Sequence, residues 1–447
     1  MKIMSEKINI IGGGLSGSLM AIYLAKRGFE INLFERRPDM RKNKISAGKS
    51  INLALSTRGL RALEKVGLDK EILAEAIPMP GRMMHQKDGE LAYHPYGKNG
   101  QAINSVSRGL LNIRLLELAD EYKNITLHFN TKCIDVDVDN SIATFEMENG
   151  TRQIFQSDRI IGTDGAFAAT RSKLQTSDRF NYWQNYLEVG YKELSIPAAN
   201  DGGFLMEKNA LHIWPRGKFM MIALPNYTGD YTCTLFLPFE GEHSFANLKT
   251  KEQVSNFFNE QFADAVKLMP TLIDDFFENP TASLVTVRCY PWVKKDKLAL
   301  MGDAAHAVVP FYGQGMNCSF EDAFVLDECI EKYGNDWNKI FDEYQKERKP
   351  NADAISELAI QNYTEMAEKV GDKHFLHKKH IEHELTELYP DKFKSQYELV
   401  TFSLSSYKYA FDQGIKNSIL LEKIIADKAE DKIKDAAYME SLWYLIQ

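Results

Sequence analysis

Ten residues near the start of the chain, Ile8-Asn9-Ile10-Ile11-Gly12-Gly13-Gly14-Leu15-Ser16-Gly17, decide the fold. The first four predict a buried strand, and the glycines predict a tight turn that opens a helix from about Leu15 to Arg27. A second strand is predicted over Glu30–Glu35. Because a helix joins two strands, the segment predicts a βαβ unit within a parallel sheet.

The glycines follow the spacing Gly12-x-Gly14-x-x-Gly17, in which each position has a separate task. Gly12 allows the tight turn, Gly14 lets the backbone approach a pyrophosphate, and Gly17 lets the helix pack on the strand. The start of the helix at Leu15 and Ser16 offers free N–H donors and a partial positive charge to the phosphates. These five residues are therefore predicted to bind a dinucleotide.

The second predicted strand ends in an acidic residue, Glu35. Its carboxylate can accept hydrogen bonds from ribose hydroxyls, and it disfavours a 2′-phosphate. The bound dinucleotide is therefore expected to be FAD or NAD rather than NADP. Arg36, the next residue, is included among the expected cofactor contacts.

Two further motifs lie far along the chain. The first is Asp158-Arg159-Ile160-Ile161-Gly162-Thr163-Asp164-Gly165, and the second is a predicted strand over Lys297–Met301 that ends in Gly302-Asp303. An acid at such a strand end can hold a polyol hydroxyl, and a helix N-terminus beside it can stabilise negative charge on a reduced flavin. Since NAD has no ribityl chain to occupy that acid, the pattern favours FAD.

The rest of the chain divides into a β-rich middle and a helical end. Short β-rich runs between about Tyr182 and Phe239 predict an antiparallel meander in a separate sheet. Helical spacing is predicted over Ile51–Leu73, with a break at Gly67, and over Lys251–Phe277. Nearly everything beyond Phe320 is predicted to be amphipathic helix.

Composition excludes several classes of protein. The 447 residues include 54 Lys and Arg against 62 Asp and Glu, a net charge of −8, which argues against nucleic-acid binding. The cysteines are odd in number and form no C-x-x-C pair, so neither disulfides nor a metal site are predicted, and a reducing compartment is favoured. They are Cys133, Cys233, Cys289, Cys318 and Cys329.

One uncharged stretch, between Lys7 and Lys26, has the hydropathy of a short membrane span. The glycines in its middle would weaken a continuous helix, and the C-terminus carries no anchor-like segment. We therefore expect a soluble, cytoplasmic protein without a membrane anchor.

With the three motifs in this order, the chain resembles the FAD-dependent aromatic hydroxylases of the para-hydroxybenzoate hydroxylase type over about residues 7–350. The most specific string is Gly302-Asp303-Ala304-Ala305-His306, continued by Pro310-Phe311-Tyr312-Gly313-Gln314-Gly315-Met316-Asn317. Within the family, the chain is most similar to the members that hydroxylate kynurenine, on the strings Gly81–His85, Tyr93–Gly97 and Ser107–Asn112. One departure is Ala168, where the family usually has a small hydroxyl.

The resemblance implies an α/β fold in which a Rossmann-like FAD-binding domain is interleaved with an antiparallel-sheet substrate domain. The FAD-binding domain is expected over 1–180, with a substrate-contacting excursion at about 75–105, and again over 291–350. The substrate domain is expected over 181–290, and a C-terminal helical region over 351–447.

The activity implied is NADPH-dependent hydroxylation of L-kynurenine to 3-hydroxykynurenine, with O₂ activated as a hydroperoxide at flavin C4a. The flavin carries this chemistry, so no general base is assigned. Two alternatives stay open: a related flavin hydroxylase for another aromatic acid, and a flavin-binding redox scaffold without turnover. The NADPH docking site and the oligomeric state are not predicted.

The expected substrate is an aromatic amino acid, whose carboxylate needs a positive partner when buried. Arg82 can bind it bidentately, and Tyr96, Asn362 and Tyr397 are expected to complete the anion site. The alternative for Arg82 is a surface arginine after a turn, and for the two tyrosines it is ordinary core packing. Other residues expected at the substrate are Phe236, Phe311 and Gln314.

The resemblance also extends the predicted FAD contacts. It adds Arg108 and Asn112, one turn apart at the start of a predicted helix. The remaining contacts are Asp164, Asp303, Gly315, Met316 and Asn317. His306 is expected to be structural, because no acidic partner is apparent beside it in the sequence, and Cys318 is expected to be a small buried filler.

Overall fold

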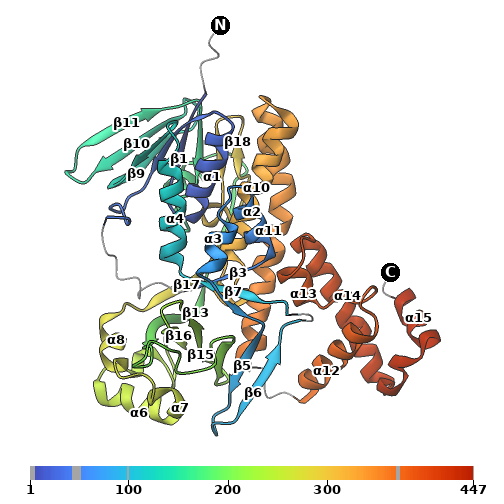
Figure 1. The fold of residues 1–447 in the computed structure, drawn as a ribbon. Coiled ribbons are helices and arrows are strands. Elements are labelled where there is room, and N and C mark those ends of the chain that lie inside the picture. Colours follow the sequence, from blue (N-terminus) through green and yellow to red (C-terminus); the bar gives the residue numbers. More distant parts are fainter. Residues whose placement is uncertain (1–5, 43–51, 98–99, 369–372, 446–447) are drawn as a thin grey trace.

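The protein is represented by a computed structural model that describes residues 6–42, 52–97, 100–368 and 373–445 (Figure 1). The predicted βαβ unit forms at the start of the chain, with its two strands parallel and Ile8 opposite Ile31. Ile8 and Ile10 are fully buried, as expected for a strand covered on both faces. The unit consists of β1 (Lys7–Ile11), α1 (Leu15–Lys26) and β2 (Glu30–Phe34).

This unit belongs to a six-stranded sheet in the order β18-β19-β12-β1-β2-β8. Its neighbours are parallel except for β18, which is antiparallel to β19. The three sequence motifs therefore meet at the carboxyl ends of three adjacent strands, where a parallel sheet binds nucleotides. The additional strands are β8 (Ile125–His128), β12 (Arg159–Gly162), β18 (Val293–Lys294) and β19 (Leu298–Leu300).

Helix α1 packs against α4 and α10 beside this sheet, and a small antiparallel sheet of β9, β10 and β11 extends from it at the upper left of Figure 1. The helices are α4 (Arg108–Asp120), α5 (Ala169–Leu174), α9 (Asp303–His306) and α10 (Gly315–Tyr333). The strands are β9 (Thr131–Asp137), β10 (Ile142–Met147) and β11 (Arg152–Gln156).

The predicted meander lies in a second, seven-stranded sheet in the order β17-β13-β16-β15-β14-β5-β6. It is antiparallel except where β5 joins β14 in parallel, a pairing that the sequence does not predict. One face packs on α6, α7 and α8, and the other faces the first domain. The strands are β5 (Gly81–His85), β6 (Leu91–Pro95), β13 (Asn181–Ile196), β14 (Leu211–Pro215), β15 (Met220–Pro225), β16 (Tyr231–Pro238) and β17 (Ala282–Tyr290), and the helices are α6 (Lys251–Gln261), α7 (Ala263–Val266) and α8 (Leu272–Glu278).

The helical prediction over Ile51–Leu73 is partly wrong. Ile51 lies outside the described residues, and Leu53–Leu55 form strand β3 instead, because they pair with β7 in a three-stranded sheet. The predicted break at Gly67 is confirmed, since Gly67 has a positive φ of 80° between two helices. The elements are β4 (Ile77–Met79), β7 (Ile103–Val106), α2 (Thr57–Glu64) and α3 (Asp69–Ala74).

The predicted helical end is confirmed, and it lies beside the second sheet in Figure 1. Its longest helix contains Pro350 and packs along α10 and α14. Within the described ranges, no helix combines the length and the apolar character that crossing a membrane requires. The helices are α11 (Trp337–Glu368), α12 (Lys373–Leu388), α13 (Gln396–Thr401), α14 (Tyr407–Ala426) and α15 (Ala436–Leu445), with short 3₁₀ turns at Phe245–Asn247, Pro310–Tyr312 and Glu430–Lys434.

Candidate active site

The glycine turn leaves the start of α1 open. A side chain at Gly17 would collide with the Gly12 carbonyl and the Thr163 hydroxyl, so close packing requires glycine there. A Cβ at Gly14 meets no heavy atom of the described residues within 4 Å, and the helix begins there without a side-chain cap. The N–H groups near Leu15 and Ser16 are therefore accessible to an anion.

The acid at the end of β2 lies beside this turn. Glu35 is buried, and its carboxylate accepts hydrogen bonds from the backbone and side chain of Arg37 at 2.9 and 2.8 Å. Arg36 is exposed. In α4, Asn112 is buried and donates to the Gly13 carbonyl at 3.2 Å, which stabilises the glycine turn. Arg108, at the start of the same helix, is exposed.

Asp164 follows β12 and is held by the start of α5. Its carboxylate accepts hydrogen bonds from the hydroxyl and the backbone N–H of Thr170, at 2.5 and 3.1 Å. Burial raises the pKa of Asp164 despite these bonds. The small hydroxyl residue that the family usually has is replaced here by Ala168. Thr170, two residues further on, supplies a hydroxyl to Asp164 instead.

The third motif forms a loop and two helix starts. Asp303 is exposed at the first turn of α9, just after Gly302, which has a positive φ of 60°. α10 begins at Gly315 without a side-chain cap, so it offers backbone N–H groups there and at Met316. The side chain of Asn317 binds the backbone of Ser56, Ala54 and Gly313 at 2.8 to 3.0 Å, which fixes the start of α10 against β3.

These residues fit FAD. The open Gly14 turn suits a pyrophosphate, and the uncapped α10 start suits a negatively charged ring. Gln314 adds a more specific observation: it is 1% exposed, its Oε1 accepts from the Tyr407 hydroxyl at 2.8 Å, and within the described residues its buried Nε2 has no hydrogen-bond partner. A buried amide without a partner is costly and indicates a missing acceptor.

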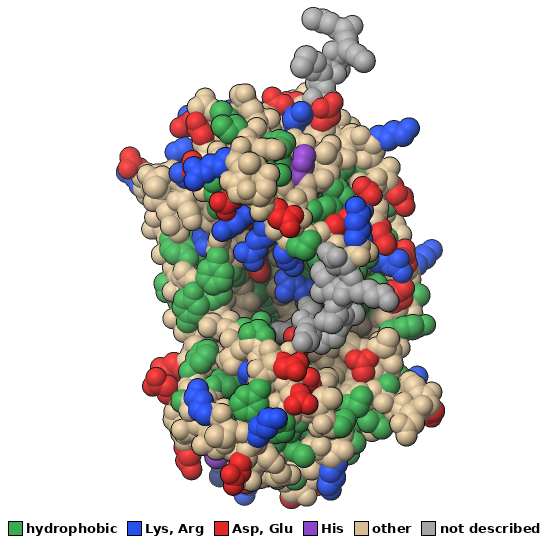
Figure 2. All heavy atoms as spheres, turned by 90° about the vertical axis from the view of Figure 1, so that its left-hand side faces the viewer, with side chains coloured by type: hydrophobic (Ala, Val, Ile, Leu, Met, Phe, Trp, Pro, Cys, Tyr) green, Lys and Arg blue, Asp and Glu red, His purple; other side chains and the backbone are tan. Residues whose placement is uncertain are grey.

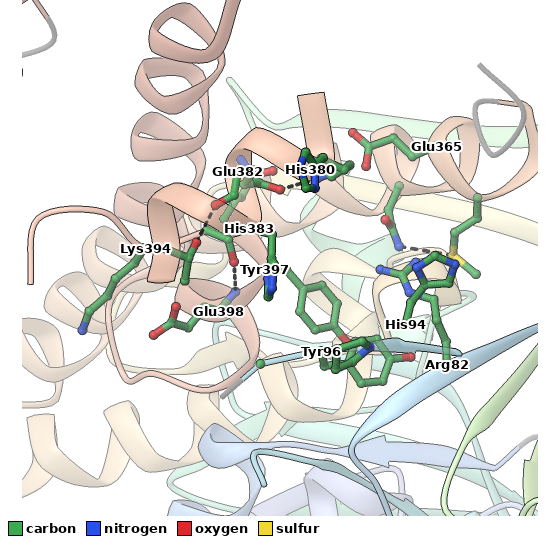
Figure 3. Close-up of a pocket in the computed structure, with 18 of the residues that line it drawn as sticks. Arg82, His94, Tyr96, Glu365, His380, Glu382, His383, Lys394, Tyr397 and Glu398 are labelled. Atoms are coloured by element: carbon green, nitrogen blue, oxygen red, sulfur yellow. Dashed lines mark hydrogen bonds and ion pairs between the residues drawn. The ribbon is translucent and has the colours of Figure 1, made fainter. Parts of the chain in front are cut away.

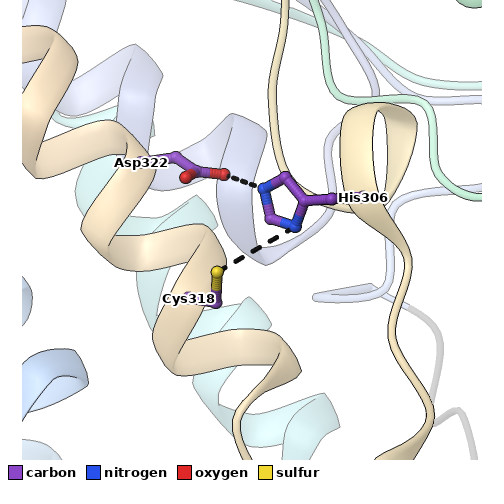
Figure 4. Close-up of side chains that lie close together, drawn as sticks. All are labelled: His306, Cys318 and Asp322. Atoms are coloured by element: carbon purple, nitrogen blue, oxygen red, sulfur yellow. Dashed lines mark hydrogen bonds and ion pairs between the residues drawn. The ribbon is translucent and has the colours of Figure 1, made fainter. Parts of the chain in front are cut away.

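His306 has an acidic partner, contrary to the sequence-based expectation. Its Nε2 lies 2.5 Å from the Asp322 carboxylate, which also binds the Gly302 N–H and the Arg348 guanidinium (Figure 4). Burial alone would lower the pKa of His306, but Asp322 raises it well above its usual value. The expectation failed because Asp322 lies sixteen residues away, on the next helix.

Cys318 completes this cluster, 4.0 Å from Nδ1 of His306. Its predicted burial is confirmed. Cys318, His306 and Asp322 could hold a metal ion by their spacing alone. However, the Arg348 guanidinium already contacts Asp322 and the Cys318 sulfur at 2.8 and 3.4 Å and would repel a cation. The arrangement is an ion-pair network that supports the third motif.

A small apolar chamber lies between the second sheet and this loop. It has a volume of about 80 Å³, and Phe236 and Phe311 line it with their rings 4.9 Å apart. The other apolar walls include Ile103, Leu211, Ile213, Met220, Ile222 and Leu224. We call this space the inner chamber.

A larger cavity of about 720 Å³ adjoins the inner chamber and opens toward the C-terminal helices (Figure 3). Arg82, Tyr96, Asn362 and Tyr397 line both spaces. The rings of Tyr96 and Tyr397 stack at 4.9 Å, and the Arg82 guanidinium lies 5.4 Å from the Tyr96 ring. The four residues predicted to form the anion site, from three distant segments, are therefore brought together.

Three features of this junction and of the outer cavity were not predicted. Tyr312 lines both spaces and stacks near Tyr397 at 5.7 Å, although the sequence shows it only as part of the third motif. Asn362 donates its amide N–H to the Phe311 carbonyl at 2.7 Å, which ties α11 to the loop. Charged residues of α12, including Lys379 and Glu382, line the outer cavity, and no sequence motif marked them.

Figure 2 shows the face turned toward the viewer hollowed at mid-height, with Lys and Arg side chains gathered around the hollow.

Residues 6–359 match the family model described as FAD binding domain. The glycine turn and the loop at the carboxyl ends of adjacent strands thus define an FAD-binding protein, with an apolar chamber beside the loop.

Comparison with curated proteins gives the narrower assignment. The chain is 48% identical to kynurenine 3-monooxygenase of Flavobacterium johnsoniae, over 96% of each chain. It is 45% identical to that of Christiangramia forsetii over 99% of each, and 46% identical to that of Dictyostelium discoideum over 95% of this chain and 94% of the other. The chain belongs to the kynurenine 3-monooxygenase family of FAD-dependent aromatic hydroxylases.

Solved structures share the fold at low identity. 2-Methyl-3-hydroxypyridine-5-carboxylic acid oxygenase superposes with a TM-score of 0.67 at 20% identity, covering 83% of this chain and 94% of the other. Pseudomonas aeruginosa PqsL, in a complex with 2-aminobenzoylacetate, superposes with a TM-score of 0.64 at 19% identity, covering 81% and 96%.

Proposed function

We propose that the protein hydroxylates L-kynurenine to 3-hydroxykynurenine with FAD, NADPH and O₂. The observation that carries the choice of substrate is Arg82. Its side chain lies where an apolar chamber meets the outer cavity, and among the described residues no carboxylate lies within 4.0 Å of its guanidinium. A half-buried guanidinium without a counter-charge suits a substrate carboxylate.

The surrounding residues would divide the substrate between two environments. Arg82 and Tyr96 would hold the carboxylate, and Tyr397 and Asn362 would complete that site from the helical region. Phe236 and Phe311 would pack against the aromatic ring in the inner chamber and exclude water from it. Because the ring amine of kynurenine already activates the neighbouring carbon, no residue is assigned to remove a proton.

FAD would be held by the residues of the three motifs. The α1 start at Gly14, Leu15 and Ser16 would bind the pyrophosphate, and Glu35 the ribose. Other proposed contacts are Gly12, Gly17, Arg36, Arg108, Asn112, Asp164, Asp303, Gly315, Met316 and Asn317. When bound, the flavin accepts hydride from NADPH and activates O₂ for transfer of one oxygen atom to the ring.

The test is aerobic turnover of the purified holoenzyme with NADPH, with products identified by mass. We expect kynurenine to accelerate NADPH oxidation and to gain one oxygen atom, whereas 4-hydroxybenzoate and salicylate do neither. Oxygenation of one of these acids instead would establish the alternative hydroxylase. NADPH oxidation that no aromatic compound stimulates would favour a redox scaffold.

We also propose a cytoplasmic location. Cys133, Cys233, Cys289, Cys318 and Cys329 are all free thiols. A protein that keeps every cysteine reduced is typical of a reducing compartment. Fractionation of the native cells with an antibody would test this, and recovery outside the cytoplasmic fraction would contradict it.

A further inference from the structure

The sheet strand that carries Arg82 has a second face, on which buried histidines form a hydrogen-bonded chain. His85 in β5 and His212 in β14 lie on the face opposite Arg82, since side chains alternate along a strand. Nδ1 of His85 lies 2.8 Å from the Asp264 carboxylate in α7, and its Nε2 lies 2.9 Å from Nδ1 of His212. Nε2 of His212 lies 2.8 Å from the Glu207 carbonyl oxygen.

The number of protons in this chain follows from its ends. A carboxylate and a carbonyl oxygen are both acceptors, so each end requires an N–H from the ring beside it. The bond between the rings requires one further proton. Three protons on two imidazole rings mean that one ring is an imidazolium, so the pair carries one positive charge next to Asp264.

The charge belongs on His85. Burial lowers the pKa of His212 to about 4, which makes His212 the neutral ring, protonated at Nε2. Burial alone would raise the pKa of Asp264, but hydrogen bonds from His85 and Trp214 outweigh it and lower this pKa to about 2. The chain therefore ends in an ionised carboxylate beside an imidazolium.

The surroundings of the chain are fixed as well. The rings of His85 and Trp214 stack at 3.9 Å, and the ring of Tyr231 meets His212 edge-on at 5.5 Å. Two further charged groups lie near the chain. Arg216 lies near Asp264, and its guanidinium donates to the His85 carbonyl at 3.0 Å. Glu207 lies near His212. His85 is 5% exposed and His212 is 1% exposed. Water therefore does not replace the hydrogen bonds of the two rings.

Strand β5 is fixed on this side by the histidine chain and by the Arg216 bond to the His85 carbonyl. It pairs with β14 over three residues only, and its other neighbour is the exposed edge strand β6, with which it forms the long hairpin seen in Figure 1. We propose that Asp264, His85 and His212 are positioning residues that lock β5 onto β14 and α7, and thereby hold Arg82 at the mouth of the inner chamber. This inference rests on the proposed function, in which Arg82 binds the substrate carboxylate.

The proposal predicts a pH dependence of substrate binding. As pH rises and the pair loses its shared proton, one of the three hydrogen bonds is lost, because two protons cannot satisfy three bonds. KM for kynurenine then increases, whereas kcat changes little, since no reacting atom is touched.

The proton count is tested first, on the wild-type holoenzyme with ¹⁵N-labelled histidine. At pH 7 we expect NMR to show one ring protonated on both nitrogens and hydrogen-bonded to a ring protonated on Nε2 only. In His85→Gln, the signals of the doubly protonated ring should disappear. Two neutral rings would overturn the proposal. This measurement needs no substrate, so it separates failure of the proposal from failure of the proposed function.

The positioning role is tested with Asp264→Asn. We expect KM for kynurenine to rise about tenfold, the effect of one charged hydrogen bond, with kcat within about twofold and the FAD dissociation constant unchanged. The alkaline rise in KM should begin at lower pH, because the imidazolium has lost its counter-charge. An unchanged KM, or a fall in kcat alone, would overturn the proposal.

Two further variants complete the test. Glu430→Gln removes the carboxylate of an exposed pair, His377 and Glu430 at 3.0 Å, and should leave KM and its pH profile as in the wild type. His212→Asn can either donate to or accept from His85, so it no longer requires the charge. We expect the alkaline rise in KM to disappear in this variant, and its persistence would overturn the proposal even if Asp264→Asn failed to fold.

Discussion

At the scale of single residues, Arg82 is the proposed partner of the substrate carboxylate. Replacing it with Ala should raise the dissociation constant of kynurenine by about 30-fold or more, since removing one partner of a buried charge pair costs about 2–5 kcal/mol. The dissociation constant of Arg82→Lys should lie between those of the wild type and Arg82→Ala, because lysine keeps the charge but cannot form two parallel hydrogen bonds. Titration followed by the flavin spectrum measures this, and FAD should remain bound. Unchanged affinity in Arg82→Ala would exclude it from the site.

Asp322 is the residue on which the loop network depends. Asp322→Asn should lower the free energy of unfolding by about 3–5 kcal/mol, because His306 and Arg348 lose their buried partner. These contacts lower the pKa of Asp322, so its contribution is complete above the unfolded pKa near 3.9 and is lost as pH falls below it. Urea unfolding should show the variant and the wild type converging in acid.

The matched control for Asp322 lies on the same helix. Glu331 is 71% exposed, and Glu331→Gln should change the free energy of unfolding by less than about 1 kcal/mol. Equal losses of unfolding free energy in the two variants would mean that the buried network stabilises the protein no more than an exposed ion pair does. His306 shows why this network was missed: its acid is remote in sequence, and the only local signal is Asp322 itself, a charged residue on an otherwise apolar helix face.

At the scale of elements, the start of α1 separates packing from cofactor binding. Gly17→Ala should destabilise the protein without FAD, since its Cβ collides with Gly12 and Thr163. Gly14→Ala meets open space, so the apoprotein should melt as the wild type does, whereas the FAD dissociation constant should rise about tenfold or more as the pyrophosphate is held off. Normal FAD affinity in Gly14→Ala would contradict this placement.

Elements with a strong local pattern were predictable from the sequence, and those defined by distant partners were not. The βαβ unit and the β14–β16 meander follow from apolar periodicity and glycine turns. Leu53–Leu55 were predicted as helix because three residues show no period, and only pairing with β7 makes them a strand. Nothing within Gly81–His85 indicates that β5 joins β14 in parallel, yet that pairing places Arg82 in the candidate site.

At the scale of the whole molecule, three regions must stay assembled for the substrate site to exist. Arg58 of α2 joins two of them, the FAD-binding region and the C-terminal helices: its fully buried guanidinium pairs with Glu321 of α10 at 2.7 Å and donates to the Val400 carbonyl of α13 at 3.3 Å. It also donates to the Ser405 carbonyl and lies 4.0 Å from the Tyr407 ring. Since Tyr397 lies on α13, Arg58 connects the FAD-binding region to the helix that closes the substrate site.

Arg58→Ala should therefore loosen α13 and the start of α14 without disturbing the glycine turn of α1. We expect faster amide hydrogen exchange over residues 396–410, a rise of about tenfold in KM for kynurenine, and an unchanged FAD dissociation constant. Arg61→Ala, on the same helix but with a longer 3.9 Å pair to Glu328, serves as the control and should leave all three near wild type. Faster exchange throughout the chain would instead indicate general unfolding, and unchanged exchange over 396–410 would mean that packing alone holds the C-terminal helices in place.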